Sequence, residues 1–149
     1  MTEAEFWELI GTVDRSLLEG GDEDGALRPL YEALRGQPDE RLAGFGECLA
    51  HALYAIDGKV WAEKAGISGT SDDGFLYARC YVVAQGRAFY EAVRCHPERF
   101  PKSLDCWCEG LLYEHRRAWA AGAERDASEW PFETSVSFET GSHQELWAG

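Results

Sequence analysis

Basic residues are scarce in this chain. Its 149 residues include 14 lysines and arginines against 27 aspartates and glutamates, a formal net charge of −13 at pH 7. Contacts to phosphate groups need clustered lysine and arginine, so this balance argues against direct binding of nucleic acid or of an anionic membrane. The surplus of acid fits a soluble protein, or one that meets a basic partner protein.

Long hydrophobic runs are lacking too, and none approaches the length of a membrane-spanning helix. The opening residues, MTEAEFWELIG, are acidic and amphipathic, without the basic and apolar regions of a secretory signal. The chain has five cysteines, an odd number that cannot all pair, and most of them lie in stretches with a helical pattern. This usage predicts reduced thiols rather than a disulfide framework, and we expect a cytoplasmic protein.

Signatures of known chemistry are also missing. The sequence has no glycine-rich phosphate loop, no nucleophile elbow and no zincin motif. The nearest approach to a metal site is Cys108 with His115, which are seven residues apart and share one face of a predicted helix. Two aligned ligands are not the four that structural zinc needs, so we expect no metal and no other cofactor.

Aromatic residues, by contrast, are plentiful, with six Trp, six Tyr and seven Phe in a chain of single-domain length. Apolar residues recur at helical spacing through most of it, which predicts one compact, mainly α domain of about five or six helices. Pro29 indicates either that the second helix begins near Arg28 or that it is kinked. The expected helices span residues 2–18, 22–35, 38–57, 59–67, 71–95 and 103–122, the last with Ser103 as N-cap.

Residues 126–149 have a different character from the helical domain predicted for residues 1–125. This tail has turn residues, yet it also carries Trp130, Trp147 and further large apolar side chains. We interpret it as an irregular arm that packs back on the helices, with a short strand possible at TSVSF. In the alternative interpretation the arm binds a partner, and Trp130 and Trp147 form the binding surface.

The most informative stretch is GTSDDGFLYARCYVVAQGRAFY, residues 69–90. Ser71 is a good N-cap, and Asp72 and Asp73 then face the positive end of the predicted helix. Arg79 lies on the apolar stripe of this helix, where a charge must be paired, and its candidate partners are Asp72 and Asp57. Alternatively, Asp72, Asp73 and Arg79 form a catalytic group, although adjacent helical carboxylates point about 100° apart.

A resemblance rests on this stretch. SDDGF, Arg79 four positions after Phe75, and then Gly86 and Phe89 are similar to the signature of a bacterial family known as domain of unknown function 4240. The resemblance extends over about residues 2–120 and includes FWELI near the start, Phe45, Asp57 and Pro97. It implies a small, mostly helical domain and no particular activity.

Two functional hypotheses follow. The first is a non-enzymatic, acidic interaction or regulatory module, which could neutralise a toxin or occupy the basic surface of a partner protein. A tryptophan-rich groove edged with acids would suit such a partner. The second is a small enzyme or ligand-binding protein that uses the carboxylates and arginine of the Ser71–Arg79 helix start.

Overall fold

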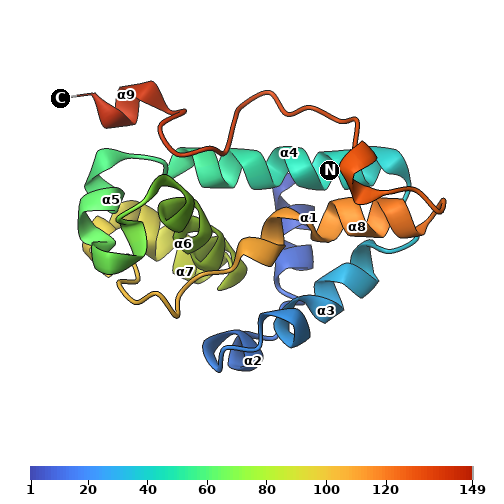
Figure 1. Cartoon of the computed structure of the whole chain (residues 1–149), viewed down its shortest axis with the longest axis horizontal. Helices are drawn as coiled ribbons and strands as arrows, with labels where there is room; N and C mark the ends of the chain where they lie inside the picture. Colours follow the sequence, from blue (N-terminus) through green and yellow to red (C-terminus); the bar gives the residue numbers. More distant parts are fainter. Residues whose placement is uncertain (149) are drawn as a thin grey trace.

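The computed structural model describes residues 1–148, and within them all regular structure is helical (Figure 1). Nine α-helices occur in this part of the chain, more than the five or six expected, because two predicted helices are each broken into two and a further short helix, α9, forms in the tail. No described helix is long and apolar enough to cross a membrane. The helices are α1 (Glu3–Ile10), α2 (Arg15–Glu19), α3 (Glu23–Leu34), α4 (Asp39–Ala55), α5 (Lys59–Lys64), α6 (Asp72–Ala84), α7 (Arg87–Cys95), α8 (Glu114–Ala121) and α9 (Gln144–Trp147), with 3₁₀ turns η1 (Gly66–Gly69), η2 (Pro97–Arg99), η3 (Glu109–Leu112) and η4 (Ala127–Glu129).

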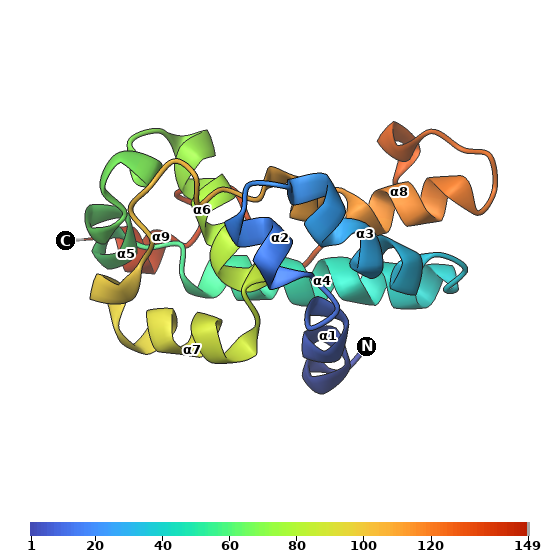
Figure 2. The same cartoon turned by 90° about the horizontal axis from the view of Figure 1, so that it is seen from below.

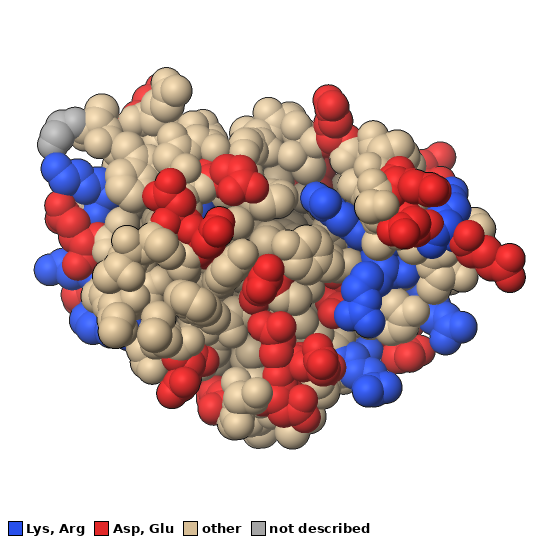
Figure 3. Space-filling view, in the orientation of Figure 1, with Lys and Arg blue, Asp and Glu red and all other residues tan. Residues whose placement is uncertain are grey.

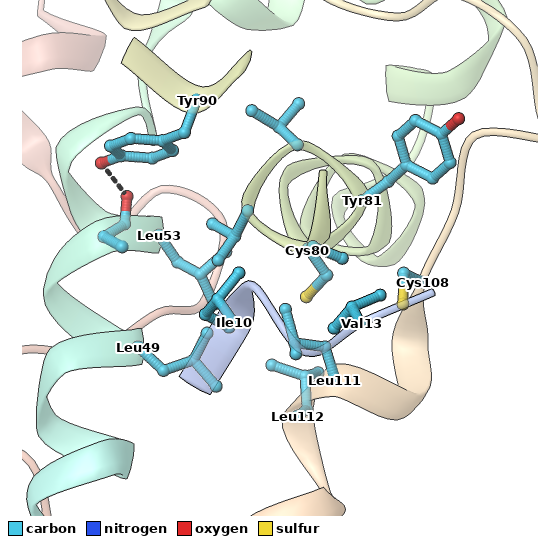
Figure 4. Packing of buried hydrophobic residues seen from close by; sticks show 14 of the residues in the cluster. Ile10, Val13, Leu49, Leu53, Cys80, Tyr81, Tyr90, Cys108, Leu111 and Leu112 are labelled. Atoms are coloured by element: carbon cyan, nitrogen blue, oxygen red, sulfur yellow. Dashed lines mark hydrogen bonds between the residues drawn. The ribbon is translucent and has the colours of Figure 1, made fainter. Parts of the chain in front are cut away.

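Helix α4 forms the long axis of the molecule. Its 17 residues contact α1, α6 and α8, so it joins the two ends of the fold (Figure 1). Helix α6 is the most buried element, with ten of its 13 residues inaccessible. Figure 4 shows side chains of α4, α6 and the segment around Leu111 meeting in one core, where Cys80 and Cys108 are both buried and reduced.

Two predicted helices are interrupted. The helix expected over residues 2–18 ends at Ile10, and α2 begins after Asp14, whose carboxylate accepts a hydrogen bond from the Leu17 amide. The helix expected over residues 71–95 is broken at Gly86, which has φ of 102°, a value that side-chain-bearing residues rarely adopt. Apolar residues continue on both sides of each break, so periodicity alone does not reveal them.

The prediction of one long helix over residues 103–122 is wrong. Only α8 and the short η3 form there, and Ser103 accepts from the Asp105 amide within a turn instead of capping a helix. The Cys108 amide donates to the Tyr77 carbonyl of α6 at 3.1 Å, a tertiary bond that replaces a helical one. Helix α3 starts at Glu23 and continues through Pro29, so the second helix does not begin near Arg28.

The tail runs along α4 from η4 to α9 (Figure 1). TSVSF is irregular, and no strand occurs among residues 1–148. From Trp130 to Thr140, partly buried residues alternate with exposed ones, and the even-numbered positions are the partly buried ones. Trp130, Phe132 and Phe138 pack against the core in this way. We call residues 130–148 the arm.

Candidate functional site

Arg79 lies on α6 in the centre of the fold, with no exposed side-chain surface. Its Nη1 donates to the Leu53 carbonyl at 2.9 Å, and its Nη2 donates to Thr140 Oγ1 of the arm at 3.0 Å. Its guanidinium also lies 4.8 Å from the centre of the Phe75 ring. The nearest charge is Asp57, with 3.9 Å between Nη2 and Oδ1. Burial lowers the Arg79 pKa, and Asp57 partly offsets this shift.

Asp57 is the anchor of the arm. This carboxylate is fully buried just after the end of α4. Its Oδ1 accepts from the Gly141 amide at 3.1 Å and from Trp147 Nε1 at 2.8 Å, while its Oδ2 accepts from the His143 amide at 3.0 Å. The His143 ring stacks on Tyr54 at 3.9 Å between centroids. Asp57 and Arg79 therefore hold the arm onto the helical domain together.

The structure does not bring the Asp72 and Asp73 carboxylates to Arg79. Both residues are exposed at the start of α6, where Ser71 Oγ caps the helix by accepting from the Gly74 amide at 2.9 Å. Asp72 reaches the cluster only through its backbone carbonyl, which accepts from Thr140 Oγ1 at 2.7 Å. Of the two candidate partners of Arg79, the structure places Asp57 beside it. Asp72, Asp73 and Arg79 do not converge as a catalytic group.

Cys108 and His115 do not share a helix face, because Cys108 precedes η3 and His115 lies on α8. Both are buried. Burial, then nearby acids, raise the pKa of the Cys108 thiol well above its ordinary value, which disfavours the thiolate that metals bind. Among the residues described, no group of three or more His, Cys, Asp or Glu side chains is placed to hold a metal ion.

Trp130 and Trp147 both contact their own chain. Trp130 packs edge-on against His115 and Trp119, with ring centroids 4.9 and 5.6 Å away. Trp147 packs edge-on against Phe75 at 5.9 Å while donating to Asp57. Each ring is only partly accessible, and the two contact different parts of the fold: Trp130 lies against α8, and Trp147 against Phe75 of α6.

A serine, a histidine and a glutamate meet where the arm crosses α4. His51 Nε2 lies 2.8 Å from Glu47 Oε1 and 2.9 Å from Ser135 Oγ, and Ser135 Oγ also contacts Glu47. In a catalytic triad the acid and the hydroxyl bind opposite nitrogens of the imidazole. Here both use Nε2, so the cluster ties the arm to α4 and does not activate the serine. Ser135 is 84 residues from His51 and 88 residues from Glu47 along the chain, so no local sequence pattern predicts this contact.

A groove of about 410 Å³ lies between α1, α4 and α7. Figure 2 shows α1 and α7 on the same side of α4. Its floor is aromatic, with Phe6 and Trp7 of α1 and Tyr90 of α7, and the Trp7 and Tyr90 rings lie 5.0 Å apart. Tyr90 is fixed by donating to the Ala52 carbonyl at 2.6 Å (Figure 4), and burial raises its pKa. We call this the aromatic groove.

The rim of the aromatic groove is acidic. Glu3, Glu47 and Glu91 line it, together with the cation Arg94. Glu91 is paired with Arg94 at 2.8 Å, and Glu3 with Arg87 at 3.0 Å, but these pairs are exposed and therefore weak. A basic group of another molecule that makes better contacts can therefore replace Arg87 and Arg94 as the ion-pair partners of Glu3 and Glu91.

In the part of the chain that the structure describes, these features define a small helical domain. A buried aspartate and a buried arginine hold its arm in place. The chain belongs to the family described as Protein of unknown function (DUF4240), whose model matches residues 1–127. No curated protein and no solved structure matches the chain. The family match ends at residue 127, just before the arm.

Proposed function

We propose that the protein is a non-enzymatic interaction module that binds a basic segment of a partner protein in the aromatic groove. The observation that carries the proposal is an apolar floor beside the rim carboxylates of Glu3 and Glu91, since Glu47 is engaged by Ser135 and His51. Trp7 and Tyr90 are only 8% and 4% exposed, so a lysine or arginine of the partner can lay its aliphatic stem along their edges and direct its charge to Glu3 or Glu91.

The charge of the whole chain supports the same class of partner. A net charge of −13 attracts basic proteins from a distance and raises their association rate. Figure 3 shows aspartate and glutamate spread over much of one face of the molecule. Neutralising a basic toxin and covering the basic surface of a regulated protein are two forms that this function can take.

The test is isothermal titration calorimetry with two short peptides, Ac-Leu-Arg-Leu-Arg-NH2 and Ac-Leu-Glu-Leu-Glu-NH2. We expect the arginine peptide to bind and the glutamate peptide not to bind. A Glu3→Gln/Glu91→Gln double variant should weaken binding by about fivefold, because two exposed charge pairs are worth roughly 1 kcal/mol together. It also frees Arg87 and Arg94 to repel the peptide.

A matched control keeps the change in net charge but moves it away from the groove. Glu19 and Glu40 are exposed and do not line the groove, so Glu19→Gln/Glu40→Gln should bind the arginine peptide nearly as well as the wild type. Equal weakening by both double variants would show that only net charge matters and would reject the groove as the docking site.

A further inference from the structure

A second cavity, of about 380 Å³, lies between the arm and the helical domain. Gly46 and Leu49 of α4 and His115 and Arg116 of α8 form one wall, and the arm from Trp130 to Glu139 forms the other. This volume is in the range of small-molecule sites. We call it the arm pocket.

His115 is the buried polar group of the arm pocket. Its side chain is 3% exposed, and its Nδ1 is fully buried without a hydrogen-bond partner. Burial, and then the charge of Arg116, lower its pKa to about 3, so the ring is neutral and offers one donor and one acceptor. A Cβ atom at Gly46 would lie 3.0 Å from His115 Nε2, so the imidazole sits directly against this wall. Buried polar groups in folded proteins are normally paired, and among the residues described His115 has no hydrogen-bond partner. Its Nδ1 is closed off from solvent, whereas its Nε2 faces Gly46 of the pocket wall, so Nε2 is the atom that a ligand in the pocket can bind.

Arg116 supplies a positive charge to the same pocket. This guanidinium forms no ion pair or hydrogen bond within the part of the chain described, and its Nε is buried without a partner. Figure 3 shows one group of lysine and arginine over the α8 end of the molecule and another at the opposite end, near α5. Glu133 and Glu139 of the arm also border the pocket, and both are exposed. These two carboxylates outnumber the single arginine, so they disfavour a multiply charged anion, and a singly charged acid must place its charge directly on Arg116.

Aromatic rings make up much of the remaining wall. Trp130, Phe132 and Phe138 of the arm border the pocket, and the Trp130 and Phe132 rings meet edge-on at 4.9 Å. Such walls favour a flat, apolar ligand body, which stacks offset or edge-on against them.

We propose that the arm pocket binds a small aromatic carboxylic acid that carries one negative charge. Its carboxylate binds the Arg116 guanidinium, whose planar fork matches a carboxylate. Its ring lies against Trp130, Phe132 and Phe138, and His115 hydrogen-bonds a polar atom of the ligand. This site is separate from the aromatic groove, so it does not depend on the function proposed above.

The test uses indole-3-acetate as probe, with neutral indole-3-acetamide and cationic tryptamine as charge controls, in calorimetric titrations of the full chain. The expected order of affinity is acetate, then acetamide, then tryptamine. Arg116→Gln should weaken indole-3-acetate binding at least tenfold and abolish its advantage over the amide. Arg99→Gln, an exposed arginine on η2, makes the same charge change outside the pocket and should leave binding unchanged.

A second variant and a spectroscopic signal test the role of His115. His115→Phe keeps the ring contacts with Phe45 and Trp130 but removes the hydrogen bond, so it should weaken the probe severalfold in a folded protein. In ¹⁵N NMR of the wild type, the probe should shift the ring nitrogens of His115 and not those of His96. The proposal is overturned if indole-3-acetate does not bind at millimolar concentration, or if Arg116→Gln binds it as tightly as the wild type.

Discussion

Arg79 shows how a buried charge is held mainly by neutral oxygen atoms. Its two hydrogen bonds are to the Leu53 carbonyl and to Thr140 Oγ1, while Asp57 lies 3.9 Å away. Its place on the apolar stripe of α6 was enough to predict burial. The sequence could not choose between Asp57 and Asp72, because that choice depends on how the end of α4 packs against α6. Nor could it show that Thr140, 61 residues further on, completes the site.

Replacing Arg79 should destabilise the fold strongly. Arg79→Ala leaves the Leu53 carbonyl without this donor and Asp57 without its counter-charge, and breaking a buried pair typically costs about 3–5 kcal/mol. The free energy of unfolding from urea titration measures the effect. Arg99→Ala, on an exposed arginine, is the matched control and should change it by less than about 0.5 kcal/mol. An unchanged denaturation midpoint for Arg79→Ala would contradict the structural role.

At the scale of elements, capping residues and apolar periodicity located most helices but not their breaks. Helix α4 spans Asp39–Ala55 within the predicted 38–57, and α5 lies within the predicted 59–67. The breaks at Gly11 and Gly86 interrupt stripes that continue on the other side, so the pattern predicted one helix in each case. The aromatic groove was equally inaccessible from the sequence, because its walls come from three helices whose packing no local pattern encodes.

The break at Gly86 should depend on glycine itself. With φ of 102° and ψ of 170°, this residue occupies a region that is essentially restricted to glycine. We expect Gly86→Ala to lower the free energy of unfolding by about 1–3 kcal/mol. Gly122→Ala is the control, because Gly122 has φ of −69° and the nearest atom to an added Cβ lies at 3.6 Å. Equal effects in thermal unfolding would show that the α6–α7 turn tolerates a side chain.

At the scale of the whole molecule, the two proposed sites differ in location and in the charged group that each offers to a ligand. The aromatic groove lies between α1, α4 and α7 and has an acidic rim, whereas the arm pocket lies beneath the arm and contains Arg116. The arm connects them indirectly, because Ser135 binds Glu47, which also lines the groove. Ser135 lines the arm pocket and Glu47 lines the groove, so this one contact belongs to both sites.

The acidity of the whole molecule gives the groove proposal a further measurable consequence. The rim carboxylates and the net charge of −13 attract a basic peptide through solvent, where salt screens charges over about 10 Å at 0.1 M and about 3 Å at 1 M. Binding of Ac-Leu-Arg-Leu-Arg-NH2 should therefore weaken by about tenfold or more as sodium chloride rises from roughly 0.05 M to roughly 0.5 M. Contact of the leucine side chains and the arginine methylene groups of the peptide with the apolar floor of the groove is not screened, so some affinity should remain at the higher concentration. Calorimetric titrations at several salt concentrations measure both contributions. Affinity that does not change with salt would show that the carboxylates of Glu3 and Glu91 take no part, and it would leave only the aromatic floor as a contact.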